Sequence, residues 1–171
     1  MYTIGEKRNM SSDNSCVKGL VRQYQSSWKM LRTAVENIPD EKWHSGSEGW
    51  YFSLNAYHIV ETMEFYMNEG PDEMKWGSRA GFDWDNVEDK EKDVLPKISK
   101  GLVITYLSEM EERFTKIMNT MDSEKLDAKD GFHWFESILE KFLYLLRHNM
   151  HHNGELSRSL RDWGCKRSKW V

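Results

Sequence analysis

Apolar residues recur along most of the chain at intervals of three and four, the period of an α-helix with one buried face. The first stripe predicts a helix that ends before Pro39, since a proline disfavours helical geometry in the residue preceding it. Its apolar members are Val17, Leu20, Val21, Tyr24, Trp28, Leu31 and Val35. A second stripe predicts a helix over about residues 52–67, which Gly70 and Pro71 stop.

Two longer stripes follow in the second half of the chain. The first predicts a helix over about residues 95–121, with Pro96 in the first turn, where its missing N–H costs nothing. The second predicts a helix over about residues 134–163, closed by Gly164. Residues 122–130 read as a polar break, and residues 45–49 as a loop with one short turn. No alternation typical of a strand is present.

The pattern therefore predicts an all-α fold, a four-helix bundle with a long crossover between the second and third helices. One domain spans residues 1–171, with a polar stretch over about 1–14 and a basic tail over about 165–171. The crossover, about residues 69–95, is long for a compact domain and carries Trp76 and Trp84. It is either a lid over a site or a simple connection between helices that are not neighbours, pinned by its tryptophans.

Composition excludes several classes of function. The 171 residues include 24 basic and 28 acidic side chains, a net charge of -4, with no basic patch for nucleic acid. No apolar run approaches the roughly 18–20 residues of a membrane span, and the N-terminus lacks an apolar signal core, which predicts a cytoplasmic protein. Cys16 and Cys165 fit neither a zinc spacing nor a disulfide framework, so we expect free thiols.

The histidines are the candidate functional residues, as ligands of a metal ion. Three of the six lie within residues 148–152, and His148 and His152 are one helical turn apart, a spacing that offers two ligands to a metal. His151 is turned away from the apolar stripe. His58 shares a helix face with Leu54 and is a candidate third ligand. Each histidine also has a structural alternative to metal binding. His58 could be a hydrogen-bonded core residue, His152 could lie hydrogen-bonded at the boundary of the core, and His148 could be exposed to solvent.

Two stretches of the sequence resemble the DinB/YfiT-like superfamily. They are Ser53-Leu54-Asn55-Ala56-Tyr57-His58-Ile59-Val60-Glu61 and His148-x-x-His151-His152-x-Gly154-Glu155-Leu156, the latter followed by Leu160-Arg161-Asp162-Trp163-Gly164. The resemblance runs from the first predicted helix to Gly164. It implies a four-helix bundle in which His58, His148 and His152 hold a divalent metal ion, zinc or nickel, with positions left open for water or substrate.

The resemblance implies a metal-dependent enzyme, a transferase or hydrolase acting on a small molecule, with a low-molecular-weight thiol such as bacillithiol or mycothiol as cosubstrate. The alternative is a non-catalytic bundle that binds metal for stability or sensing and whose surface serves to form a homodimer. Glu61 and Glu155 each follow a histidine by three residues. Either carboxylate could orient an imidazole, bind substrate or act as a base, or simply pair with a nearby Lys or Arg.

A ferritin-like di-iron site is excluded by its ligand pattern. Such a site needs Glu-x-x-His from two helices. The one Glu-x-x-His of this chain begins at Glu41 and ends at His44, in the loop region after Pro39. The sequence also lacks a nucleophile motif for a Ser-His-Asp hydrolase and a phosphate-binding loop.

Overall fold

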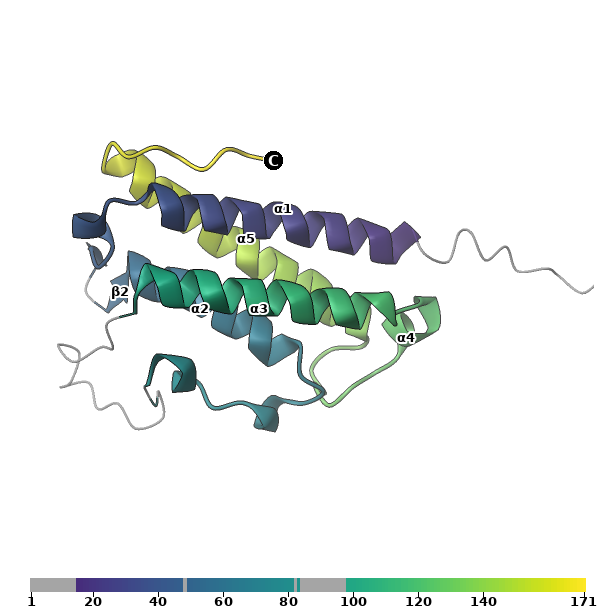
Figure 1. Ribbon diagram of the computed structural model, residues 1–171. Helices are drawn as coiled ribbons and strands as arrows, with labels where there is room; N and C mark the ends of the chain where they lie inside the picture. The colour runs from purple at the N-terminus through teal and green to yellow at the C-terminus, as the bar shows by residue number, and fades with distance from the viewer. Residues whose placement is uncertain (1–14, 48, 82, 84–97) are drawn as a thin grey trace, which may run out of the picture.

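The computed structural model describes residues 15–47, 49–81, 83 and 98–171 (Figure 1). Within them, four helices are long: α1 (Ser15–Asn37), α2 (Phe52–Tyr66), α3 (Lys100–Asn119) and α5 (Ile138–Asp162). A short helix, α4, spans Ser123–Asp127, and single 3-10 turns span Asp40–Lys42, Pro71–Glu73 and Ser78–Ala80. The predicted all-α class is confirmed, apart from one two-stranded sheet.

The long helices pack in a closed cycle of neighbours. α1 packs against α3 and α5, and α2 packs against the same two helices. The Trp43 indole N–H, just before α2, donates to the Ile98 carbonyl just before α3 at 2.6 Å, so both helices begin at the same end. Figure 1 shows α2 and α3 running in one direction. The chain therefore leaves α2 at one end of the bundle and enters α3 at the other. Trp84 and Leu95, predicted in this crossover, lie outside the described residues.

An aromatic cluster joins three of the helices in the core. The rings of Tyr24 on α1 and Phe114 on α3 are 4.3 Å apart, and Phe142 on α5 meets both rings edge-on. The Tyr24 hydroxyl donates to the Phe142 carbonyl at 2.7 Å, which satisfies its only polar group inside the core. These contacts fix the position of α5 relative to α1 and α3.

Two helices begin later than their apolar stripes predict. The third helix begins at Lys100 rather than near residue 95, because the Ser99 hydroxyl caps it by accepting the Leu102 N–H at 3.0 Å. The last helix begins at Ile138 rather than near residue 134, with Ser137 as its cap. The predicted polar break over residues 122–130 contains α4, capped by Asp122. A capping side chain, more than the apolar period, sets where these helices start.

The region predicted as a loop near residue 46 contains a short hairpin. β1 (Gly46–Ser47) pairs antiparallel with β2 (Trp50–Tyr51), so the expectation of no strand is wrong at this point. Gly46 has φ 153°, and a Cβ there would lie 2.7 Å from the Trp50 carbonyl oxygen, so the close approach of the strands requires glycine. The hairpin places Trp50 immediately before α2.

Two expectations from composition can be compared with the structure, the state of the cysteines and the absence of a membrane-spanning helix. Cys16 and Cys165 are both free thiols, the first exposed and the second half-buried. Among the helices of the described residues, none combines the length and apolar character needed to cross a membrane.

Candidate metal centre

The structure brings His58, His148 and His152 together. The Nε2 atoms of His58 on α2 and His148 on α5 are 3.1 Å apart. The ring centroid of His58 lies 5.0 Å from the ring centroid of His148 and 5.0 Å from that of His152. The ring centroids of His148 and His152 are 4.5 Å apart. All three side chains are half-buried. The predicted convergence of these rings is therefore observed, and their role as metal ligands stays a prediction.

Helical geometry explains how the cluster forms. His148 and His152 differ by four residues, so they project from the same side of α5 one turn apart. α2 packs against α5 in this region and supplies His58 from its middle. The three rings thus come from two rigid helices rather than from loops, which favours a site of fixed geometry.

The spacing of the nitrogens fits a metal ion. A tetrahedral ion with bonds of about 2.0–2.1 Å holds its nitrogen ligands about 3.3 Å apart. The 3.1 Å between the Nε2 atoms of His58 and His148 is close to this value. One ligand nitrogen of each ring lies within 4.8 Å of the others, so the group could hold a metal ion after small side-chain shifts.

Glu155 fixes the third imidazole. Its Oε2 lies 2.7 Å from Nδ1 of His152, which leaves Nε2 of that ring for the cluster. Asn55 donates to the same oxygen at 2.9 Å and Trp50 does so at 3.4 Å. A carboxylate on the second nitrogen of an imidazole is the arrangement that orients metal-binding histidines in many proteins. Partial burial alone would raise the pKa of Glu155, but its bonds to His152 and Asn55 outweigh that and lower it.

Electrostatics keep two of the imidazoles neutral. Burial, followed by the proximity of the other two histidines, lowers the pKa of His58 to about 3. Burial and the neighbouring His152 lower the pKa of His148 to about 4. Only a neutral imidazole has a lone pair for a metal. Both rings are therefore ready to bind a cation at neutral pH without first losing a proton.

Aromatic side chains surround the cluster. The ring of Trp50 lies 5.4 Å from that of His58 and 5.6 Å from that of His152. Trp76, from the crossover, stacks on His58 at 6.5 Å, and Tyr144 stacks on His148 at 6.4 Å. These rings limit the access of water to the imidazoles. The contact of Trp76 with His58 agrees with both interpretations of the crossover, a lid over the site and a connection pinned by its tryptophans. Trp84 lies outside the described residues.

Glu61 anchors the crossover segment near Trp76. This carboxylate is 2% exposed and lies in the middle of α2. It accepts hydrogen bonds from the Gly77 backbone N–H and from the Tyr57 hydroxyl, the latter at 3.1 Å. Glu61 thus attaches the polypeptide next to Trp76, one turn along α2 from His58, which is a role that the sequence did not predict.

Arg79 provides a second attachment of the same segment. Its guanidinium binds both carboxylate oxygens of Glu64 on α2, at 2.8 and 2.9 Å, and reaches Glu109 on α3 at 2.5 Å. It also lies over the ring of Tyr106, 4.3 Å from the centroid. The segment around Trp76 is therefore held to both helices that it passes.

His151 points outward, as predicted. Its side chain is 69% exposed, and its Nε2 lies 3.6 Å from Oε1 of Glu155. His151, His152 and Glu155 form a second group with the spacing of metal ligands, more exposed than the first. This group uses the carboxylate that orients His152, so the two groups share their side chains and are not independent sites.

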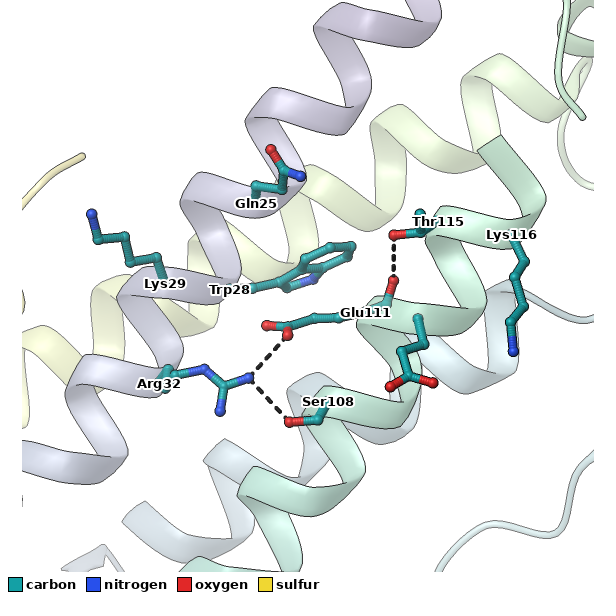
Figure 2. A pocket seen from close by; sticks show the side chains of 9 residues that line it. Gln25, Trp28, Lys29, Arg32, Ser108, Glu111, Thr115 and Lys116 are labelled. Carbon is teal, nitrogen blue, oxygen red and sulfur yellow. Dashed lines mark hydrogen bonds and ion pairs between the residues drawn. The ribbon is translucent and has the colours of Figure 1, made fainter. Parts of the chain in front are cut away.

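A separate hollow of about 660 Å³ lies between α1 and α3. Figure 2 shows Trp28 between the two helices, with Arg32 reaching across to Glu111 and Ser108. Those distances are 3.0 and 3.3 Å. The lining contains no histidine or cysteine among the described residues, and its central charges neutralise each other. We therefore regard this hollow as a solvated groove and the histidine cluster as the candidate site.

Sequence reasoning missed three side chains at the cluster. Asn55 precedes His58 by three residues, so its place on the same side of α2 was available from helical spacing. Tyr144 precedes His148 by four residues and follows the same rule. Trp50 had no such signal, because its position depends on the hairpin of β1 and β2.

No protein-family model matches this chain, and no curated protein matches it either. The interpretation of the cluster therefore rests on its own geometry and chemistry.

Proposed function

We propose that this chain is a metal-binding four-helix bundle of the DinB/YfiT-like superfamily, in which His58, His148 and His152 hold one divalent ion, zinc or nickel. The observation that carries the proposal is the 3.1 Å approach of two Nε2 atoms from residues 90 positions apart. Without a cation, Nε2 of one of these rings can only donate to Nε2 of the other, and Nδ1 of His148 is buried without a hydrogen-bond partner in the described part of the chain, which is costly. A bound cation would accept the lone pairs of both Nε2 atoms.

We further propose that the protein is a transferase or hydrolase that acts on a small molecule with a low-molecular-weight thiol as cosubstrate. Three imidazoles leave at least one position of a divalent ion open. A bound ion would supply a Lewis acid that lowers the pKa of a water or thiol. Glu155 orients His152 for this purpose, and Trp50 and Trp76 keep bulk water away.

Metal analysis of protein purified without an affinity tag tests the metal site. We expect about one zinc or nickel ion per chain in the wild type, and loss of that ion in His58→Ala and His152→Ala. His151→Ala is the matched control, since it removes an exposed imidazole from the same helix. Equal metal content in His58→Ala and the wild type would refute the three-histidine site.

Turnover tests the enzymatic part separately. Metal-loaded and metal-stripped protein should be assayed with small thiols and electrophilic acceptors. We expect conversion only with the metal-loaded form, and its loss in His58→Ala. Metal binding without any conversion across such a screen would favour the non-catalytic alternative, a bundle that binds metal for stability or sensing.

A further inference from the structure

Another hollow lies at the end of the bundle where α2 and α3 end and α5 begins (Figure 1). Its volume is about 560 Å³, within the range of small-molecule sites. Five apolar side chains form most of its wall, which we call the apolar wall: Met67, Ile117, Met121, Ile138 and Phe142. On α5 its lining residue Lys141 lies seven positions before His148, about 10 Å along the helix, so this hollow is separate from the histidine cluster.

A buried lysine lies at the polar end of the hollow, where Asn68, Asp130 and Lys141 meet. Lys141 is 3% exposed. Its ammonium group binds Asp130 and donates to the Asn68 carbonyl at 3.3 Å, and it lies 4.7 Å from the centre of the Phe132 ring. Burial lowers the pKa of Lys141 and outweighs the opposite effect of Asp130. One carboxylate therefore does not fully replace the water that this ammonium group has lost.

Asn68 offers a second donor at the same end. Its side-chain oxygen accepts from Arg113 at 2.7 Å, which identifies the other side-chain atom as the N–H2 group. Within the described residues this N–H2 group donates no hydrogen bond. Asn68 is only 7% exposed and lines the hollow, so its free donor faces the hollow.

The groups joined by hydrogen bonds at the polar end carry an excess of one positive charge. Lys141 and Arg113 are cations, and Arg113 binds only the neutral oxygens of Asn68 and Met67 within the described residues. Asp130 supplies one carboxylate to Lys141. A complementary ligand therefore carries one negative charge and has oxygens that accept from Asn68 and Lys141.

The hollow is held open by the polypeptide between α4 and α5. The Gly131 N–H donates to the Glu69 carbonyl at 2.8 Å, just after α2. A Cβ at Gly131 would lie 2.6 Å from that carbonyl oxygen, so this close approach requires glycine. The second oxygen of Asp130 accepts from the Phe132 N–H at 3.0 Å, which fixes the carboxylate that binds Lys141. The polar end is thus preorganised, which lowers the cost of binding a ligand there.

We propose that this hollow binds a small carboxylic acid with an apolar chain. The carboxylate accepts from the Asn68 amide and the Lys141 ammonium group, and the chain lies against the apolar wall. Binding needs no metal, so the proposal does not depend on the function proposed for the histidines.

Isothermal titration calorimetry of the full, metal-stripped chain with hexanoate tests the site. We expect one hexanoate to bind per chain. Affinity should rise by about tenfold for every two carbons along the series butyrate, hexanoate and octanoate, because each added methylene is buried against the apolar wall. Hexylamine and hexanamide, which have the same chain without the negative charge, should bind at least tenfold more weakly than hexanoate.

Asn68→Asp is the variant that tests the polar end. It replaces the free N–H2 donor by a carboxylate oxygen and keeps the acceptor for Arg113, so the fold is preserved while hexanoate binding falls by tenfold or more. Gln25→Glu makes the same amide-to-acid change at an exposed position of α1 and should leave binding intact. Lys141 is left in place, because removing its charge would leave Asp130 without its partner and destabilise the fold.

His58→Ala distinguishes this site from the histidine cluster, and it should bind hexanoate like the wild type. Far-UV circular dichroism establishes that all three variants are folded. A wild type that shows no saturable binding of hexanoate would overturn the proposal. So would equal binding of hexylamine, unchanged affinity in Asn68→Asp, or loss of binding in His58→Ala.

Discussion

The carboxylate of Glu155 connects the candidate metal centre to its surroundings. It binds Nδ1 of His152 and accepts hydrogen bonds from Asn55 and Trp50, three groups from α5, α2 and the hairpin. A single side chain thus links the orientation of one imidazole to two other elements. Removing it would free the His152 ring to rotate and would leave the Asn55 amide without this acceptor.

We predict that Glu155→Ala weakens metal binding by about 10–100-fold, the usual effect of losing the group that orients a metal-binding histidine. Glu155→Gln should have a smaller effect, since a side-chain oxygen can still accept from His152 Nδ1–H. Competition with a chromophoric chelator measures both affinities. Unchanged affinity in Glu155→Ala would show that His152 is oriented by packing alone.

At the scale of elements, the crossover between α2 and α3 is a fixed part of the site as far as it is described. Glu61 binds the backbone N–H of Gly77, and Arg79, two residues later, binds Glu64. Trp76, next to these attachments, contacts His58. The length of this connection follows from the parallel course of α2 and α3. The position of Trp76 against His58, by contrast, depends on the contacts made by Glu61 and Arg79.

Trp76→Ala should expose His58. We expect diethylpyrocarbonate to modify His58 slowly in the metal-free wild type and several-fold faster in Trp76→Ala, because the indole shields the imidazole. Peptide mass spectrometry follows each histidine separately. His151, already exposed, is the internal control and should react at the same rate in both proteins. Equal His58 rates would mean that Trp76 does not limit access.

The attachment at Glu64 should depend on pH. Burial alone would raise the pKa of Glu64, but hydrogen bonds from Arg79 and Tyr106 outweigh it and hold that pKa below 4.5. The folded state therefore prefers the ionised carboxylate. Its stabilising contribution is complete above pH 4.5 and is lost as the pH falls through the lower folded pKa.

We expect Glu64→Gln to lower the free energy of unfolding by about 1 kcal/mol at neutral pH, a value reduced for the partial exposure of the pair. The difference from the wild type should shrink below pH 4.5. Urea unfolding at several pH values measures it. Glu41→Gln, at an exposed position, is the control for the loss of one carboxylate and should leave the free energy of unfolding close to that of the wild type at neutral pH.

For the whole molecule, the histidine cluster brings together side chains of α2 and α5. His58 lies 90 positions before His148 in the sequence, so an unfolded chain does not present all three candidate ligands together. Any metal that binds the folded protein must therefore stabilise it.

We expect zinc at about 100 times its dissociation constant to add about 2.7 kcal/mol to the free energy of unfolding. Thermal unfolding with and without the metal measures this effect. The increase should vanish in His58→Ala and remain in His151→Ala. A stabilisation of equal size in all three proteins would indicate metal binding elsewhere on the surface.

The sequence by itself determined the helices, because each has an apolar face that repeats with the helical period over many residues. The sequence pattern was less accurate about where the helices begin. The apolar residues Trp134 and Phe135 extend the predicted stripe before the start of α5. The helix nevertheless begins at Ile138, because Ser137 caps it. The hairpin was missed because strands of two residues are too short to show alternation.

The candidate ligands were also predictable in part. The spacing of His148 and His152 follows from one helix, and local geometry alone places both on one side and His151 on the other. Their meeting with His58 depends on how α2 packs against α5, which no local pattern contains.

Only the tertiary structure decided what surrounds the cluster. Trp50 arrives through a hairpin and Trp76 through the crossover, and each is placed by contacts between residues distant in sequence. The same holds for Glu61, whose position in the sequence suggested chemistry but whose bonds hold the backbone at Gly77. A helix period is a property of consecutive residues and can be read from them. Which side chains meet across two helices depends on packing of the whole chain, and that appears only once it is folded.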